Sequence, residues 1–420
     1  MTTDNNVYSL ETPENPLEKL LKQGAQQLLA QAIEAELQQL LTKYEDQTVN
    51  GVKRVVRNGY QPERDLQTGL GDIAVKIPKV RDRAKEGVKF NSSLVPPYLK
   101  KAKSVEELIP WLYLRGISTG DMQPALSSLL GDNAKGLSAS TVSRLKSTWE
   151  DEFLTWSKRD LSKRRYVYVW ADGVYSKVRM GNKLCLLVMI GVDEQGRKEL
   201  LAVVDGERES ELSWKEVLNQ LKSQGLNKAP ELAIGDGALG FWNAVTKVWP
   251  TTRQQRCWVH KIANVLNKVP KSMQPKIKAH LQDIWMAESE DSALKAYDLF
   301  SKNYEVKYPK AVKCLTKDKD EMLAFYQFPA EHWSHIRTSN PIESMFATIR
   351  LRTHKTKGCG SRNTTLSMVF KLAQAAECKW RRLRGFKLLA DVITGVKFKD
   401  GIRINEEILT EHQELSVHQI

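Results

Sequence analysis

Cysteine is scarce in this sequence, and its few copies are scattered. The 420 residues include five cysteines, an odd number without paired spacing: Cys185, Cys257, Cys314, Cys359 and Cys378. This pattern excludes a disulfide framework and a zinc ribbon, and it favours a reducing compartment. The sequence also lacks any apolar run of about 18 residues, and it starts without the basic and apolar segments of a secretory signal. We therefore expect a cytoplasmic protein with no membrane partner.

Acidic residues are too few to balance the basic ones. The chain has 64 Lys and Arg against 50 Asp and Glu, which gives a formal net charge of +14 at pH 7, and 41% of its residues are hydrophobic. This composition can build buried cores, and the length is typical of about two to four domains. The positive charge favours a polyanionic partner, with nucleic acid as the first candidate.

The first hundred residues predict two segments. Residues 1–48 carry leucines at steps of three and four between Leu17 and Leu41, the period of an amphipathic helix. This helix is a candidate for dimerisation, and folding back on its own domain is an equal alternative. Residues 49–100 predict a basic β-ribbon, because glycine turns separate short alternating runs. Its charged residues, which also fit a merely solvated face, are Lys53, Arg54, Arg57, Lys76, Lys79, Arg81 and Arg83.

Residues 101–165 predict three short helices with a tight turn at Gly116, and then a basic linker. The third helix is polar and carries Arg144 and Lys146. This pattern is typical of a helix-turn-helix module, in which both side chains would contact DNA. A small helical bundle without any role in DNA binding has the same pattern and stays open as the alternative.

Strands and helices alternate from residue 166 onward. Strands are predicted at 166–172, 183–193, 198–206, 230–236 and 253–260, and helices at 210–225 and 240–249. A three-strand meander followed by alternating strands and helices predicts an α/β domain of RNase H-like topology. The first part of this domain is 166–260 and the second part, with basic helices, is 337–400, because an all-α insertion at 261–336 interrupts it. The tail at 401–420 contains no motif. The predicted protein is therefore multidomain.

Two of the predicted strands end in Asp followed by Gly, at Asp172 and at Asp236. A turn would explain one such ending. Two of them in neighbouring strands would bring both carboxylates to one edge of the sheet. Close carboxylates repel each other, so a divalent cation between them is the better explanation, and oxygen ligands suit Mg²⁺ or Mn²⁺.

A third acid, Glu343, follows the insertion. Asn340 is predicted to cap a helix that has Pro341 in its first position, so Glu343 also fits an ordinary capping box. The residues beyond it favour a functional role, because 344–387 are rich in Lys and Arg and contain one acid, Glu377. Glu343 therefore begins a basic helix that suits a phosphate backbone.

The sequence resembles the mutator-type transposases of bacterial insertion sequences over nearly its whole length. The segments that carry the resemblance are RNGYQPERDLQTGLGDIAVKIPKVRDR, LRGISTGDMQPALSSLLG, LSASTVSRL, ADGVYSKVR, AIGDGALGFWNAV, QRCWVHKIANVL and SNPIESMFATIRLRT. The resemblance implies a DDE transposase, whose catalytic residues Asp172, Asp236 and Glu343 hold two Mg²⁺ ions, with Mn²⁺ as a substitute. Such an enzyme nicks DNA and joins the freed 3′-hydroxyl to a new phosphodiester.

The resemblance also implies partners. These are double-stranded DNA, both terminal inverted repeats and target DNA, and a second copy of the chain, as a homodimer on paired ends. Excised circles are a possible product, and the protein would be associated with the nucleoid.

Further residues are predicted near the three acids. Cys257 and His260 have the spacing of zinc ligands, but no second pair accompanies them. The family carries this Cys-x-x-His beside its active site, so the two residues are predicted to support the site, with core packing as the alternative. Trp258, Trp285 and Trp333 either stack on an unpaired base near the cleavage point or lie in the core. Predicted phosphate contacts, with a solvated face as the alternative, are Arg350, Arg352, His354, Lys355 and Lys357.

Two rival functions fit the same sequence. The first is an RNase H-fold nuclease that cleaves without joining, which a strand-transfer assay would distinguish. The second is a non-catalytic helix-turn-helix regulator with structural acids. A missing acid would favour the regulator, and none of the three is missing.

Overall fold

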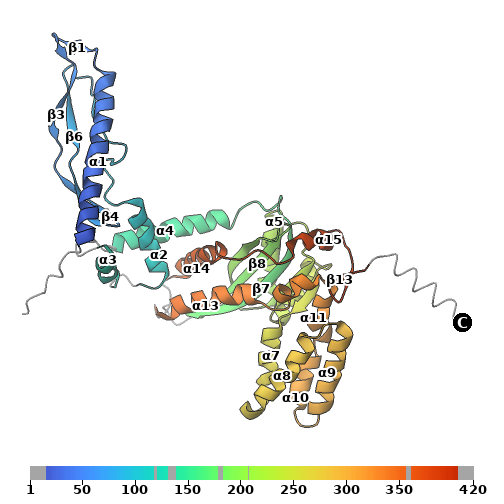
Figure 1. Cartoon of the computed structure of the whole chain (residues 1–420). Coiled ribbons are helices and arrows are strands. Elements are labelled where there is room, and N and C mark those ends of the chain that lie inside the picture. The colour runs from blue at the N-terminus through green and yellow to red at the C-terminus, as the bar shows by residue number, and fades with distance from the viewer. Residues whose placement is uncertain are drawn as a thin grey trace, which may run out of the picture. The chain divides into compact units, whose positions relative to one another are not determined.

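The computed structural model describes residues 16–117, 121–130, 139–177, 183–206, 208–355 and 361–404 (Figure 1). The chain divides into two compact units, residues 1–145 and 146–420. Its multidomain, mixed α/β organisation agrees with the sequence prediction. Within the described ranges, no helix is both long enough and apolar enough to cross a membrane.

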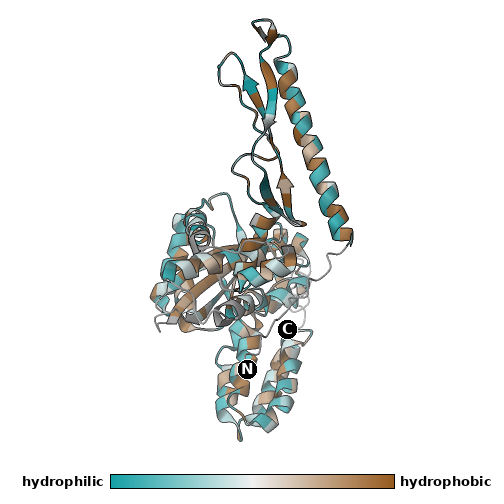
Figure 2. Cartoon of the chain, turned by 90° about the vertical axis from the view of Figure 1, so that its left-hand side faces the viewer, coloured by the Kyte–Doolittle hydropathy of each residue, from teal (hydrophilic) through white to brown (hydrophobic). Residues whose placement is uncertain are grey.

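The first unit packs one long helix against short antiparallel strands. Its elements are α1 (Pro16–Lys43), β1 (Thr48–Val49), β2 (Val52–Lys53), β3 (Val55–Tyr60), β4 (Arg64–Thr68), β5 (Gly71–Val75), β6 (Pro78–Asp82), α2 (Lys103–Leu114) and α3 (Met122–Leu130). Strand β3 pairs with β6, β4 pairs with β5, and β1 pairs with β2. Hydrophobic and hydrophilic residues alternate along α1 (Figure 2). Ile33 and Leu37 of this helix lie in a core with Leu66 and Ile73 of the strands.

The two halves of α1 differ in burial, and its predicted role in dimerisation stays a prediction. Its C-terminal half folds back on β4 and β5 through Ile33 and Leu37. Its N-terminal half exposes four leucines, with 48–68% of each residue's surface accessible: Leu17, Leu20, Leu21 and Leu28.

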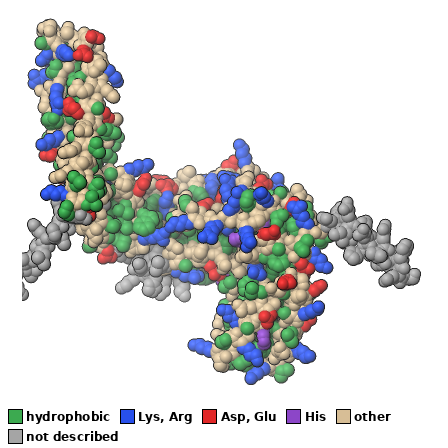
Figure 3. All heavy atoms as spheres, in the orientation of Figure 1, with side chains coloured by type: hydrophobic (Ala, Val, Ile, Leu, Met, Phe, Trp, Pro, Cys, Tyr) green, Lys and Arg blue, Asp and Glu red, His purple; other side chains and the backbone are tan. Residues whose placement is uncertain are grey.

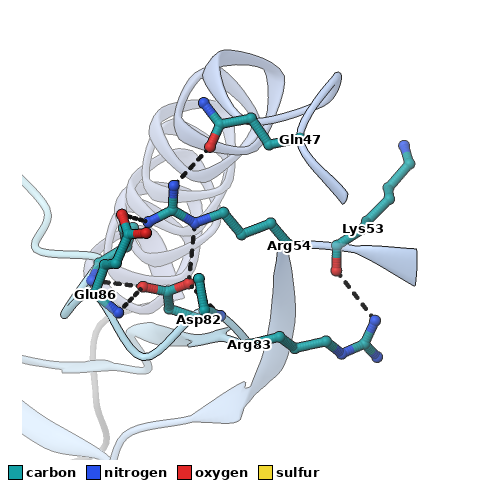
Figure 4. A network of polar contacts seen from close by, with 8 residues as sticks. Gln47, Lys53, Arg54, Asp82, Arg83 and Glu86 are labelled. Carbon is teal, nitrogen blue, oxygen red and sulfur yellow. Dashed lines mark hydrogen bonds and ion pairs between the residues drawn. The ribbon is translucent and has the colours of Figure 1, made fainter. Parts of the chain in front are cut away.

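Much of the basic charge predicted for the ribbon is paired within the unit. Arg54 donates to Asp82 at 3.2 Å, to Gln47 at 2.7 Å and to Glu86 at 2.5 Å, and Arg83 donates to the backbone oxygen of Lys53 (Figure 4). Further ion pairs on this unit join Lys53 to Glu45, Arg57 to Glu34 and Lys76 to Glu63. Acidic side chains are correspondingly interspersed among the basic ones on its surface (Figure 3). These pairs reduce the charge that the ribbon can present to DNA.

Helices α2, α3 and α4 (Ala139–Trp156) occupy the region predicted to be helix-turn-helix-like. Val105, Ile109, Met122 and Leu126 form a small core between α2 and α3, and Leu145 of α4 packs against it. Gly116 has a φ of 105°, which suits the tight turn after α2. Residues 118–120, shortly before α3, and 131–138, directly before α4, lie outside the described ranges.

The second unit is built on a five-stranded mixed sheet. Its strands are β7 (Tyr166–Lys177), β8 (Lys183–Asp193), β9 (Lys198–Gly206), β10 (Leu232–Gly235) and β11 (Arg253–Arg256), in the order β11-β10-β7-β8-β9. The first three strands form an antiparallel meander. Strand β10 then pairs in parallel with β7, and β11 pairs in parallel with β10. The long strand β7 is therefore central.

Helices cover both faces of this sheet (Figure 1). Helices α5 (Glu211–Ser223) and α6 (Leu239–Val248) pack Trp214, Leu218 and Phe241 on one face, against Val169 and Leu187 of the strands. Alternate side chains of β7 point to the opposite face. There the indole N–H of Trp170 lies 3.2 Å from both the His335 and Thr338 carbonyl oxygens, just before α13 (Asn340–Lys355).

The remaining elements are mainly helical. They are α7 (Trp258–Leu266), α8 (Gln274–Trp285), α9 (Glu290–Tyr304), α10 (Pro309–Thr316), α11 (Lys319–Leu323), α12 (Trp333–Ile336), α14 (Arg362–Glu377), α15 (Leu389–Ile393), β12 (Phe398–Lys399) and β13 (Ile402–Arg403). The predicted fifth strand was too long. Strand β11 ends at Arg256 and α7 begins at Trp258, so Cys257 and His260 lie at a strand-to-helix junction.

Candidate active site

Asp172 lies within the central strand, not at its end. The sequence predicted that this strand stops at Asp172, but β7 continues to Lys177 because β8 pairs with it along this whole length. Asp172 is opposite Val188 of β8 and only 8% exposed. Its Oδ1 accepts the backbone N–H of Gly173 at 2.8 Å. The fold therefore buries a carboxylate in the middle of the sheet.

Asp236 lies beside Asp172. Strand β10 ends at Gly235, and its parallel register pairs Ile234 with Trp170, so a step of two residues brings Asp236 level with Asp172. Asp236 also forms the turn expected of Asp-Gly, because its Oδ1 accepts the N–H of Ala238 at 2.8 Å. The turn and the site are therefore compatible roles for this residue.

A further acid, Glu209, completes a group of three. One carboxylate oxygen from each of Asp172, Glu209 and Asp236 lies within 4.8 Å of the others. Glu209 lies in the connection between β9 and α5, next to the α5 cap residue Ser210. Nothing in the sequence marks Glu209 as a site residue, because an acid at the start of a helix is ordinary.

Glu343 belongs to a second, neighbouring group. One ligand atom from each of Cys257, His260 and Glu343 lies within 4.8 Å of the others. The His260 Nε2 atom is 3.7 Å from Glu343 Oε1. A fourth residue, Ser339, lies among them, with its hydroxyl oxygen 3.2 Å from both Glu343 Oε1 and Cys257 Sγ and 3.4 Å from His260 Nδ1. Its single proton can bond to only one of these atoms at a time.

The start of α13 differs by one residue from the prediction. The Glu343 N–H donates to the Ser339 carbonyl oxygen at 3.1 Å, so Ser339, not Asn340, occupies the cap position. Glu343 is then one residue past the capping-box position, and its carboxylate accepts the Ser339 hydroxyl. Ser339 was missed, although serine directly before Asn-Pro is a recognisable cap signal.

The electrostatics of the group formed by Asp172, Glu209 and Asp236 indicate a site that needs a cation. Burial, with the nearby Asp236 charge, raises the pKa of Asp172 to about 6. Burial and the charges of Asp236 and Asp172 raise the pKa of Glu209 to about 7. In the described part of the chain, no ion pair joins Lys or Arg to these three acids. Three carboxylates without a basic partner fit a hard divalent cation such as Mg²⁺.

The Cys257–His260 pair has different electrostatics, because each residue shifts the pKa of the other. The hydrogen bond with Cys257 is the main cause that raises the pKa of His260 to about 9. Burial alone would raise the pKa of the Cys257 thiol, but hydrogen bonds with His260 and Ser339 outweigh burial and lower it. A protonated His260 therefore faces Glu343. Three ligand atoms are also fewer than a structural zinc site requires.

The comparison with known proteins decides the family. The model of the Mutator family of transposases matches residues 4–382. This chain belongs to the Mutator family of transposases. The resemblance stated from the sequence is thereby confirmed.

Relatives of this transposase cover most of its length. The transposase for insertion sequence element IS6120 of Mycolicibacterium smegmatis is 52% identical over 298 residues, which is 71% of this chain and 92% of that protein. The transposase for insertion sequence element IST2 of Acidithiobacillus ferrooxidans is 51% identical over 299 residues, 70% of this chain and 99% of that protein. Among solved structures, the Drosophila P element transposase strand transfer complex covers 75% of this chain and 93% of its own, with 9% identity and a TM-score of 0.25. That score is too low to indicate a shared fold.

The three tryptophans of the transposase that were predicted either to stack on a base or to lie in the core each contact other residues of the chain. Trp258 is fully buried, and its indole N–H donates to the Met322 carbonyl oxygen at 3.0 Å, so core packing is the better interpretation for it. Arg337 covers the ring of Trp285, with its guanidinium carbon 4.4 Å from the ring centroid. Trp333 packs edge-on against Phe325 and Tyr326 and donates to the Phe328 carbonyl oxygen at 2.9 Å.

The residues of the transposase predicted to contact DNA are only partly described. Arg144 and Arg350 are exposed, and Lys146 is partly buried. Arg352, His354 and Lys355 belong to α13, and Lys357 lies outside the described ranges. The phosphate contacts of these residues stay a prediction.

The raised acid pKa values predict how pH changes the response to metal. Raised acid pKa values stabilise the metal-free fold below about pH 4, and this contribution is lost as pH rises through about 6 for Asp172 and about 7 for Glu209. Metal binds the deprotonated carboxylates. We therefore expect Mg²⁺ to raise the Tm of the EDTA-treated transposase at least about twice as much at pH 8 as near pH 5.5.

Thermal melts with and without Mg²⁺ at both pH values test this expectation. The difference between paired melts removes contributions that do not depend on metal, including the titration of His260. An equal Mg²⁺ effect at both pH values would contradict binding at these carboxylates.

Proposed function

We propose that this chain is the transposase of an insertion sequence and that it cuts and joins DNA at a DDE site formed by Asp172, Asp236 and Glu343. The observation that carries the proposal is the parallel register of β7 and β10, which brings Asp236 level with the buried Asp172. The helix that carries Glu343 packs against β7 and β8. The charge of Glu343 is also a minor cause, after burial and the charge of Asp236, of the raised pKa of Asp172, which supports its placement in the same site.

We assign the second unit to the RNase H-like class. The strand order β11-β10-β7-β8-β9, with an antiparallel meander followed by two parallel strands, supports this assignment. So does the location of one acid on the central strand and the next at the end of its parallel neighbour. The helical insertion lies between β11 and α13, as the assignment requires.

The acids of the proposed site would hold two Mg²⁺ ions, with Mn²⁺ as a substitute. When bound, such ions activate the attacking oxygen and stabilise the leaving oxygen at phosphorus. Asp172 is the best candidate for the shared ligand, since it is the most buried of the three acids and responds to the charges of both others. The rigid strand β7 fixes its position, and the turn bond to Ala238 fixes that of Asp236.

Cys257, His260 and Ser339 support the site by orienting Glu343. The Ser339 hydroxyl donates to Glu343 Oε1, and the protonated His260 adds an attractive charge at 3.7 Å. Buried Cys257 in turn accepts the Ser339 N–H at 3.2 Å, which connects the end of β11 to the start of α13. In this proposal these residues hold the third acid in place.

Double-stranded DNA is the proposed partner, as terminal inverted repeats and as target. Helix α13 runs from Glu343 through Arg350 and the basic positions after it, so it would follow the phosphate backbone away from the acids. The exposed leucines of α1 suit a homodimer on paired ends. In the joining step, the 3′-hydroxyl of the element's strand forms a P–O bond to a phosphorus of the target strand. A P–O bond of the target strand breaks at the same time, so the number of phosphodiester bonds does not change.

The test is cleavage and joining of a labelled duplex that carries the end of the element, with Mg²⁺ present. We expect nicked and joined products from the parent protein. Asp236→Asn and Glu343→Gln are each expected to reduce both products by at least about 10³-fold. Cleavage at the parental rate by either variant would overturn the assignment of that acid.

The same assay separates the rival functions. Nicking without joining on every supplied target would favour the nuclease. Specific binding without cleavage, in either Mg²⁺ or Mn²⁺, would favour the regulator.

A further inference from the structure

Two neighbouring contacts, one at the start of α5 and one with α6, position the backbone at Glu209. The next residue, Ser210, caps α5 by accepting the N–H of Ser213 at 3.2 Å. On the other side, α6 approaches through Gly240, where a Cβ atom would lie only 2.6 Å from the Glu209 carbonyl oxygen. A larger residue than glycine at 240 would therefore push this backbone away. The position of Glu209 is fixed by the packing of α5 against α6.

The side chain of Glu209 reaches over the central strand at the residue after Asp172. A Cβ atom at Gly173 would lie 2.3 Å from both the carboxyl carbon and Oε1 of Glu209. The absence of a side chain at Gly173 is therefore what lets this carboxylate approach β7. Gly173 does not have a positive φ, so close approach, not backbone conformation, is the feature that depends on glycine here.

The resulting spacing of the three carboxylates fits a cation site. Oxygen ligands of one Mg²⁺ ion lie about 2.1 Å from it, so opposite ligands are about 4.2 Å apart. Oxygens of Asp172, Glu209 and Asp236 already lie within 4.8 Å of one another, whereas Glu343 is grouped with Cys257 and His260. Three carboxylates this close repel one another unless a cation lies between them.

We propose that Glu209 is a ligand of the divalent cation held by Asp172 and Asp236. Glu343, which lies in the neighbouring group with Cys257 and His260, then binds the second ion. This inference rests on the proposed function, since it adds a fourth acid to the same site. The alternative is that Glu209 only stabilises the N-terminus of α5, as acids before helices do. A helix-stabilising role would leave metal affinity unchanged.

Titration of the EDTA-treated full chain with Mn²⁺, followed by electron paramagnetic resonance of free Mn²⁺, measures binding without any DNA reaction. For Glu209→Gln we expect the dissociation constant of the tightest site to rise by about tenfold or more. The matched control is Glu216→Gln, at an exposed position on the adjoining helix α5, and it should bind Mn²⁺ like the parent.

A second variant tests the geometry while every acid is retained. Gly173→Ala should displace the flexible end of Glu209 and weaken Mn²⁺ binding by a similar factor. The double variant Gly173→Ala with Glu209→Gln should then show little further loss, because both changes remove one interaction. Gly69→Ala is the control, since a Cβ there meets nothing within 4 Å.

Asp172→Asn in the same titration separates the two proposals. Parental Mn²⁺ binding and cleavage by Asp172→Asn would overturn the proposed function itself. If Asp172→Asn loses both while folded Glu209→Gln keeps parental Mn²⁺ affinity, only the role of Glu209 is overturned. Weakened binding in Glu209→Gln and in Gly173→Ala, with both controls unchanged, would support it.

Discussion

Asp172→Asn is expected to abolish cleavage and joining while making the metal-free protein more stable. We expect DNA nicking to fall by at least about 10³-fold, because the shared ligand of the proposed site loses its charge. Since the pKa of this buried acid is raised from 3.8 to about 6, its ionisation opposes folding at pH 8 by up to about 3 kcal/mol. The free energy of unfolding without metal should therefore increase by about 1–3 kcal/mol at pH 8.

The sign of this stability change distinguishes an acid that holds a metal from an acid with a purely structural role. A structural acid would behave in the opposite way when neutralised. Asp193, the last residue of β8, provides the matched control, because it is also buried but accepts hydrogen bonds from the N–H of Gln195 and from Arg197, with Nε at 2.8 Å. Asp193→Asn should lose about 1–2 kcal/mol and keep its cleavage rate per folded molecule.

Urea denaturation in EDTA, together with the nicking assay, measures both quantities. An Asp172→Asn variant that is inactive but destabilised would mean that the activity was lost through folding. An active variant would remove Asp172 from the site.

The bounds of a strand could be predicted from the sequence where the strand has a simple hydrophobic pattern. Strands β8 and β9 have the predicted bounds, because each is a long apolar run that ends in turn residues. The end of β7 was wrong, because Asp-Gly is a turn signal only when no partner strand continues beside it. Strand β8 does continue there and pairs Asp172 with Val188 and Gly173 with Leu187. Tertiary pairing thus overrides the local signal.

The sequence predicts the acids of the candidate site where a strand or a family motif marks them. Asp236 follows β10 directly, so the parallel register alone brings it level with Asp172. Glu209 could not be found in this way. Its approach to β7 depends on Gly173 and Gly240, and both glycines are far from Glu209 in the sequence. The role of Ser339 depends likewise on Cys257 at the end of another element. Contacts between elements, not motifs, select these residues.

The second large effect is expected from Asp318→Ala, which should destabilise the second unit by about 3–5 kcal/mol. Asp318 Oδ2 accepts a hydrogen bond from Nζ of Lys261 at 2.5 Å, and it also forms an ion pair with Arg256. The Lys261 side chain is 1% exposed and that of Arg256 is 13% exposed. Removal of Asp318 therefore leaves two buried cations without their shared anion. Asp283→Ala, at an exposed position of α8, should change the stability little.

Two further measurements test the effect of Asp318→Ala. They are the pH dependence of the loss of stability and its partial reversal by a second substitution. Burial already lowers the pKa of Lys261 to about 8, against an ordinary value of 10.5, so its ionisation opposes folding below about pH 8 and no longer does so above about pH 10.5. Without Asp318 the pKa should fall further, so the loss of stability should be larger at pH 7 than at pH 9. Adding Lys261→Met removes the buried charge and should restore at least about 1 kcal/mol.

The same variant should also impair catalysis, because Arg256 supports the turn that carries Asp236. A Cβ atom at Gly237, whose φ is 92°, would lie 2.3 Å from Arg256 Nε, so the guanidinium packs directly under this turn. Once Asp318 no longer holds Arg256, the position of Asp236 beside Asp172 is less well fixed. We expect slower nicking by folded Asp318→Ala, with partial recovery in the Lys261→Met background. Parental nicking by the folded single variant would show that the turn holds Asp236 without help from Arg256.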